Sequence, residues 1–151
     1  MTVHAEGAQG LLFPRLVQEL GERIGRRARF GRGETLFSAG DKVGGLHLVV
    51  GGRVRIVRAS SGRSIVVHHE KAGGVLGEVA LFGAGVYPAT GVASEPTETL
   101  LLPAQPLRRA IANDAALADF FLGRLARRAQ EIIARLDRLA HHTVLRRVAA
   151  H

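Results

Sequence analysis

The sequence has no cysteine and no long apolar run, and each absence removes a class of protein. Without thiols, this chain cannot hold disulfides, thiolate zinc sites or cysteine-ligated iron–sulfur clusters. Without about eighteen consecutive apolar residues, it has no segment that fits a membrane-spanning helix. Residues 1–10 also lack the basic and apolar regions of a secretory signal, so a cytoplasmic protein with no membrane partner is the simplest expectation.

Aromatic residues are scarce at 5% of the chain, whereas hydrophobic residues reach 46% and the formal net charge is +8. The hydrophobic fraction suffices for a folded core in a chain of 151 residues. The basic excess is mostly arginine, and it attracts polyanions without identifying one. The arginines are spread along the chain and lack the interleaved aromatic residues that single-strand nucleic-acid binders use.

The sequence also lacks the common catalytic motifs. It has no Gly-x-Ser-x-Gly elbow, no phosphate-binding loop motif and no cysteine nucleophile. Small β-folds of the cupin type bind a catalytic metal through a His-x-His pair and a glutamate. In the segment His68-His69-Glu70, neighbouring side chains point to opposite faces of a strand, so the two histidines cannot chelate one metal together. We therefore do not expect an enzyme, and we assign no metal-binding residues.

The middle of the sequence has the pattern of a small β-domain. Short apolar or β-branched runs alternate with glycine-containing breaks, which predicts a compact antiparallel sandwich or barrel. The runs are residues 34–37, 46–50, 54–58, 64–69, 89–93 and 98–102. Gly51-Gly52 predicts a hairpin between two of these strands, because glycine tolerates the positive φ of tight hairpin turns.

Helical patterns lie on both sides of this β-region. Residues 11–24 carry leucines at helical spacing, and Pro106 suits the first turn of a short helix that ends near Ala112. Asn113-Asp114 resembles the N-cap of a longer helix that runs from Ala115 to about Ala140.

The long predicted helix carries a seam of apolar residues at spacings of four and three. The seam residues are Leu125, Ala129, Ile132, Leu136 and Leu139. Such a seam is typical of a helix that packs against another helix, and a helix this long would extend past a small β-domain. A second copy of the chain is the simplest partner, because a two-fold interface needs only one self-complementary surface. We therefore expect a homodimer.

Three short sequences, in this order of elements, resemble a known family. They are ETLFSAGD at residues 34–41, LHLVVGGRV at residues 46–54, and GEVALF at residues 77–82 followed by PATGVA at residues 88–93. Together they resemble the effector domain of the CRP/FNR family, the cyclic-AMP receptor protein and fumarate–nitrate regulator group of bacterial transcription factors. The resemblance covers residues 11–142.

The resemblance implies a fold that is mainly β with α. Its core is an antiparallel double-stranded β-helix, a jelly-roll-like β-roll of the cyclic-nucleotide-binding type. An N-terminal helix and a long C-terminal dimerisation helix flank this β-roll. It also implies an effector pocket around a short helix that begins with Gly-Glu. The pocket residues carried over in this way are Gly77, Glu78, Val79, Ala89 and Thr90.

One residue that the resemblance requires is missing from this pocket. Cyclic-nucleotide binders of the family pair the cyclic phosphate with an arginine that aligns near Pro88, but residues 83–90 contain no basic residue. Removing one partner of a buried charge pair costs about 2–5 kcal/mol. We therefore expect that cyclic AMP is not the effector, unless Arg53, Arg55 or Arg63 reaches the pocket from a neighbouring strand.

Other effectors and roles stay open from the sequence. Haem is an alternative cofactor because histidine can ligate iron, and the candidate ligands are His47, His68 and His69. In that case the protein would be a haem-dependent sensor of NO, CO or O2 with the same fold. A stand-alone module that regulates a partner protein is a third interpretation.

The resemblance divides the chain into three parts. Residues 1–112 correspond to the effector domain, residues 113–142 to the dimerisation helix, and residues 143–151 to the start of a winged helix-turn-helix domain. Because no recognition helix follows, we expect a truncated chain that contacts DNA only through a domain it does not contain.

Overall fold

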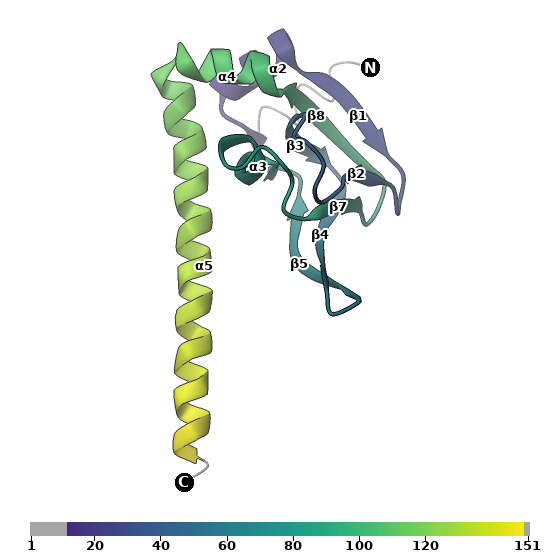
Figure 1. The fold of residues 1–151 in the computed structure, drawn as a ribbon. Helices are drawn as coiled ribbons and strands as arrows, with labels where there is room; N and C mark the ends of the chain where they lie inside the picture. The colour runs from purple at the N-terminus through teal and green to yellow at the C-terminus, as the bar shows by residue number, and fades with distance from the viewer. Residues whose placement is uncertain (1–11, 150–151) are drawn as a thin grey trace. The chain divides into compact units, whose positions relative to one another are not determined.

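Figure 1 shows the fold given by a computed structural model, which describes residues 12–149. The chain divides into two compact units, residues 1–117 and residues 118–151. The strands and the shorter helices fall in the first unit, and most of the long C-terminal helix forms the second.

The strands form two four-stranded antiparallel sheets. The first sheet has the order β1 (Arg26–Phe30), β8 (Thr97–Pro103), β3 (Gly45–Gly51) and β6 (Val75–Leu76). The second has the order β2 (Thr35–Phe37), β7 (Thr90–Ala93), β4 (Arg53–Ser60) and β5 (Arg63–Lys71). Consecutive strands often belong to different sheets, which is the winding of a β-roll and confirms the predicted fold class.

The hairpin predicted at Gly51-Gly52 is wrong. β3 ends at Gly51 in the first sheet and β4 begins at Arg53 in the second, so this glycine pair carries the chain between sheets. The tight hairpin instead joins β4 to β5, where Ser60 pairs with Arg63. Its two turn residues, Ser61 and Gly62, have φ of 52° and 78°, which is the backbone that two-residue hairpin turns require.

The crossing at Gly52 is held by the buried side chain of Thr97. Gly52 has φ of 90°, and a Cβ added there would lie 2.4 Å from Thr97 Oγ1, so only glycine fits. The Thr97 hydroxyl accepts a hydrogen bond from the Arg53 N–H at 3.1 Å. Its proton donates to the carbonyls of Glu95 at 2.8 Å or Arg53 at 3.1 Å. This contact ties the start of β4 to the start of β8 in the other sheet.

The core lies between the sheets. Val49 and Leu76 of the first sheet meet Val54 of the second, with Leu36, Phe37 and Ile56 packed against them. β1 has no counterpart among the predicted strands because its sequence, RRARF, is dominated by arginine. Two of those arginines, Arg27 and Arg29, lie 3.5 and 4.0 Å from Glu98 of the neighbouring strand β8.

Two prolines set the starts of the shorter helices. Pro14 has an extended backbone, so helix α2 covers Arg15–Ile24, and the earlier predicted start at Leu11 lies outside the described residues. Pro103 has an extended backbone too, and α4 (Ala104–Ala112) begins directly after it, two residues before the predicted start at Pro106. The predicted short helix after Gly77 is α3 (Glu78–Phe82).

The C-terminal helix is longer than predicted. α5 covers Ala115–Ala149 without interruption, whereas its predicted end was near Ala140. Residues 141–149 contain neither glycine nor proline, so nothing in the local sequence terminates the helix there. The predicted N-cap is confirmed, because Asp114 Oδ1 accepts hydrogen bonds from the N–H groups of Ala116 and Leu117 at 3.0 and 3.4 Å. Within residues 12–149, no helix has the length and apolarity needed to cross a membrane.

Replacing Thr97 with valine should destabilise the β-roll, because the valine keeps the shape but leaves backbone groups of Arg53 and Glu95 without a partner. We expect the free energy of unfolding to fall by about 1–3 kcal/mol in urea denaturation followed by circular dichroism. Thr35→Val, at an exposed threonine of β2, is the matched control and should change little. Equal unfolding midpoints for the two variants would contradict the role of this hydroxyl.

Candidate functional site

A sharp turn at Gly77 positions the start of α3. Gly77 has φ of 100° and is the N-cap of the helix, and its carbonyl accepts the first helical hydrogen bond from Leu81 at 2.9 Å. A Cβ at this position would lie 2.9 Å from the Gly45 carbonyl of β3, so the backbone approaches the sheet more closely than another residue allows. The next residue, Glu78, is only 3% exposed, which places a carboxylate inside the domain.

The remaining residues of α3 divide into a buried and an exposed side. Ala80 and Leu81 are buried, whereas Val79 is 49% exposed and Phe82 is 38% exposed. Arg108 of α4 donates a hydrogen bond from its guanidinium to the Leu81 carbonyl, which satisfies a backbone group at the end of this short helix. The predicted pocket residue Val79 therefore lies on the outer side of α3, away from its packed side.

The segment after α3 is held by ring stacking and backbone contacts. Tyr87 stacks on Phe37 with ring centroids 4.3 Å apart, and its hydroxyl accepts a hydrogen bond from the Gly44 N–H at 3.3 Å. Ala89 is buried, whereas Pro88 is exposed. The hydroxyl of Thr90 accepts a hydrogen bond from the Ala39 N–H at 2.9 Å, so it is bonded to the loop that follows β2.

The inner face of the second sheet carries an unexpected polar pair. Val54 and Ile56 of β4 belong to the core, and their partners across the ladder are Glu70 and His68 of β5. Cross-strand partners share a face, so His68 and Glu70 point to the inner side of the sheet. The His68 Nε2 atom lies 2.6 Å from Glu70 Oε1. A Cβ at Gly74 would lie 2.2 Å from Glu70 Oε2, so glycine there makes room for the carboxylate.

The three arginines considered as replacements for the missing positive charge do not lie on this inner face near the pair. Side chains alternate along β4, so Arg53 and Arg55 lie on the face opposite to Val54. Arg63 begins β5 at the hairpin turn and pairs with Ser60. The predicted absence of a basic residue from residues 83–90 is therefore not compensated by Arg53 or Arg55.

His47 is a buried histidine of the first sheet. It is 5% exposed, its Nδ1 atom lies 2.8 Å from Thr99 Oγ1, and its ring contacts the rings of Phe30 and Phe37 at centroid distances of 5.9 and 6.1 Å. Burial lowers the pKa of His47 from its usual 6.5 to about 4, so the imidazole is neutral at pH 7. Of the other candidate haem ligands, His68 is paired with Glu70, and His69 is exposed.

The charged groups around α3 and β5 are of both signs, because the Arg108 guanidinium also reaches the end of α3. Glu78 and Glu70 contribute carboxylates and His68 contributes an imidazole, whereas residues 83–90 contribute no cation. Over residues 12–149, no cluster of three or more His, Asp or Glu residues is arranged to hold a metal ion. Glu70 was not predicted as a site residue. Its separation from His68 by a single residue already places both side chains on one face of a strand.

Comparison with known sequences supports this description of the domain. The sequence model of the family described as the cyclic nucleotide-binding domain matches residues 27–114. The cyclic AMP receptor protein of Thermus thermophilus is 31% identical over 125 residues, which cover 82% of this chain and 58% of that protein. The chain thus spans less than two thirds of the length of this relative.

Comparison with solved structures gives the same fold. The catabolite activator protein of Thermus thermophilus superposes with a TM-score of 0.74 at 29% identity, over 88% of this chain and 62% of that one. The N-terminal domain of a transcriptional regulator from Streptomyces coelicolor gives a TM-score of 0.64 at 27% identity, over 82% and 85% of the two chains. The sensor domain of the regulator DNR from Pseudomonas aeruginosa, at 21% identity, shares the fold with a TM-score of 0.66 over 83% and 85%.

The buried His47 should make the domain sensitive to acid. Its folded-state pKa of about 4 lies below the unfolded value of 6.5, so the unfolded chain binds the proton more strongly. Its contribution to stability is present above pH 6.5 and is lost as the pH falls towards 4, by up to about 3 kcal/mol.

Urea denaturation at a series of pH values tests this contribution through His47→Gln, which keeps a polar side chain but does not titrate. The variant should show a shallower decline of stability between pH 6.5 and 4 than the unchanged protein. His69→Gln, at an exposed histidine of β5, should keep the original slope. Identical slopes for all three proteins would show that His47 is not the group responsible.

Proposed function

Because this chain belongs to the cyclic nucleotide-binding domain family of CRP/FNR-type regulators, we propose that it is a sensor domain whose effector is not cyclic AMP. The proposal has two parts, an altered effector pocket and a helix-mediated homodimer. Within a full-length regulator, a ligand in the pocket would favour one arrangement of the paired helices over another. It can do so only if it binds one arrangement more tightly.

The observation that carries the first part is the charge of the pocket. A cyclic phosphate needs a cation to offset its desolvation, and the segment near Pro88, where the resemblance places the phosphate-binding arginine, contains none. Arg53 and Arg55 lie on the opposite face of β4. His68 and Glu70 are polar side chains on the inner face of β5, and neither replaces the missing arginine.

The neighbouring hydroxyl does not offset this loss. The resemblance calls for a small hydroxyl residue at position 89. This chain has Ala89 there, and Thr90 is its neighbour. The Thr90 hydroxyl is bonded to the Ala39 N–H, and Ala89 has no polar side chain. A small molecule that offers hydrogen-bond donors and carries no phosphate suits this pocket better than a cyclic nucleotide.

The second part rests on the apolar seam of α5. Ile132, Leu136 and Leu139 are 51–59% exposed in the single chain, while Leu125 is half-buried and Ala129 is small. The seam keeps its spacing of four and three along one continuous helix. Burying such a stripe removes apolar surface from water, and an identical helix offers the complementary stripe. The similar long helix of the Thermus thermophilus structure is consistent with this role.

Transcription control is the proposed role of the protein to which this domain belongs. The Thermus thermophilus relatives are described as a cyclic AMP receptor protein and a catabolite activator protein, and the Streptomyces coelicolor structure as part of a transcriptional regulator. Direct readout of DNA needs an element that enters a groove. The sensor domain would act on DNA through such an element, not by its own surface.

Pro88→Arg should raise the affinity for cyclic AMP, because it returns a cation to the segment where the resemblance places the phosphate-binding arginine. We expect very weak binding by the unchanged protein and an affinity at least about tenfold higher for the variant, measured by isothermal titration calorimetry. The control is Val86→Arg, which adds the same charge at an exposed position of the same loop.

Three results would count against this part of the proposal. They are micromolar binding by the unchanged protein, an equal gain in Val86→Arg, and no gain in Pro88→Arg. The last would mean that the missing charge is not what excludes the nucleotide.

Leu136→Glu should dissociate the proposed dimer, because each copy would then bury a carboxylate in the seam. The dimer dissociation constant should rise by at least about tenfold, measured by sedimentation equilibrium. Ala134→Glu, on the opposite side of the same helix turn, should leave it unchanged. A monomer for the unchanged protein, or equal weakening by both variants, would argue for another function of the seam.

A further inference from the structure

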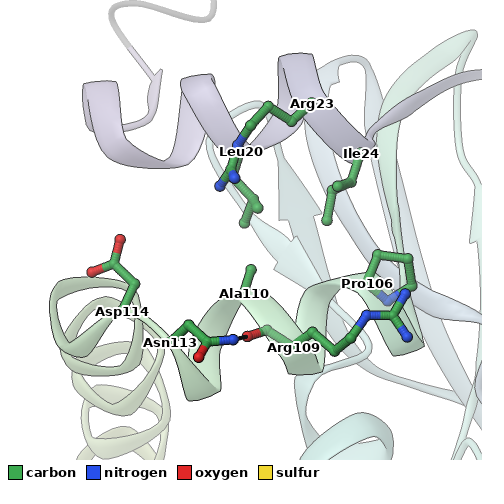
Figure 2. Close-up of a pocket in the computed structure, with 8 residues that line it drawn as sticks. All are labelled: Leu20, Arg23, Ile24, Pro106, Arg109, Ala110, Asn113 and Asp114. Carbon is green, nitrogen blue, oxygen red and sulfur yellow. Dashed lines mark hydrogen bonds between the residues drawn. The ribbon is translucent and has the colours of Figure 1, made fainter.

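A groove separates α2 from α4 within the first unit of the chain, and it is distinct from the residues around α3. Figure 2 shows its side chains, and its volume is about 450 Å³. The lining residues are Leu20, Arg23, Ile24, Pro106, Arg109, Ala110, Asn113 and Asp114. A volume of several hundred cubic ångströms is the usual size of small-ligand sites.

The centre of the groove is apolar. Leu20 and Ile24 project from α2 towards Ala110 of α4, as Figure 2 shows, and Pro106 closes one end. Leu20 itself is completely buried, so it forms the floor between the two helices. An apolar body lying in this groove would be removed from water on at least two sides.

Two arginines border this apolar surface without a carboxylate partner. Arg15, Arg27 and Arg29 form ion pairs with glutamates. Within the described part of the chain, neither Arg23 nor Arg109 forms an ion pair or a side-chain hydrogen bond. Figure 2 shows the Arg23 guanidinium at one end of the groove and that of Arg109 at the other. Each is therefore able to receive an anionic group from a ligand.

The one acidic residue in the lining does not neutralise them. Asp114 has its Oδ1 atom bonded to the N–H groups of Ala116 and Leu117, where it caps α5. Among the described residues, Asp114 forms no ion pair with an arginine, so its carboxylate oxygens lie more than 4.0 Å from the arginine side-chain nitrogens. Each arginine lies in the last turn of its helix, where a positive charge is favourable, but that preference requires no apolar hollow beside it.

We propose that this groove binds a small organic anion, a molecule with an apolar body and a carboxylate group. The body would lie on Leu20, Ile24 and Ala110, and the carboxylate would pair with Arg23 or Arg109. The site is separate from the effector pocket of the proposed function, so either proposal can fail without the other.

The groove also contains the joint between the β-domain and the long helix. Asn113 donates a hydrogen bond from Nδ2 to the Arg109 carbonyl at 2.8 Å and ends α4, and Asp114 begins α5. A ligand that engages Arg109 therefore contacts the residues where α4 passes into α5. This gives the site a regulatory role, because its occupation would restrain that joint.

Octanoate is a suitable probe because its chain is flexible and its charge is a single carboxylate. Titration of the isotopically labelled full chain should produce saturable NMR shifts at the amides of Leu20, Ile24 and Ala110. Octanamide, which has the same body without the charge, should bind about threefold to fivefold more weakly. Equal binding of the two probes, shifts confined to other residues, or no saturable shifts would overturn the proposal.

Arginine variants assign the charge. Arg23→Gln or Arg109→Gln should weaken octanoate binding by about threefold to fivefold and leave octanamide binding unchanged. The matched control is Arg15→Gln, which removes another exposed arginine from α2 outside the groove. Folding of each variant is checked from the dispersion of its own amide spectrum. If Arg15→Gln weakens octanoate as much as the groove variants do, the effect is one of net charge and the site is refuted.

Discussion

The hydroxyl of Thr97 holds the backbone at the start of β4 in place. It bonds to the backbone of Arg53 at the point where the chain leaves the first sheet, and only glycine fits at the turn before it. A strand that slips by one residue exchanges its two faces. With Arg53 held in place, Val54 and Ile56 enter the core, and Arg53 and Arg55 stay outside. The threonine and the glycine at this crossing thus act with the ladders to β5 and β7 to keep these two arginines out of the core.

That choice of face explains the electrostatic character proposed for the effector pocket. An Arg55 on the inner face would have provided a cation close to β5. Arg55 instead lies on the outer face, so His68 and Glu70 are the polar groups on the inner side. Glu78 stays buried beside the tight turn at Gly77. The tight turn at Gly77 is therefore present, while residues 83–90 hold no arginine or lysine. A domain of this kind can keep its architecture and change the chemistry that it recognises.

The sequence predicted the fold well where the pattern was local and periodic. Glycine-separated apolar runs located most strands, and Asp114 located the start of α5. It failed where distant residues decide the outcome. β1 forms by pairing with β8 despite its arginines. The Gly51-Gly52 turn joins two sheets, and the Thr97 hydroxyl bonds to the Arg53 N–H directly after it. Glu70 was overlooked because its importance depends on the register of β4. The groove between α2 and α4 could not be foreseen, since its walls come from opposite ends of the domain.

The unbroken course of α5 from Ala115 to Ala149 has a mechanical meaning. At a rise of about 1.5 Å per residue, a helix of 35 residues is about 52 Å long. Apart from Gly123, its interior holds no glycine or proline that would favour a kink. A bend of about 5° just beyond the buried Phe121 would displace the end of the helix, about 42 Å away, by roughly 4 Å, so a long helix turns a small angular change into a large displacement.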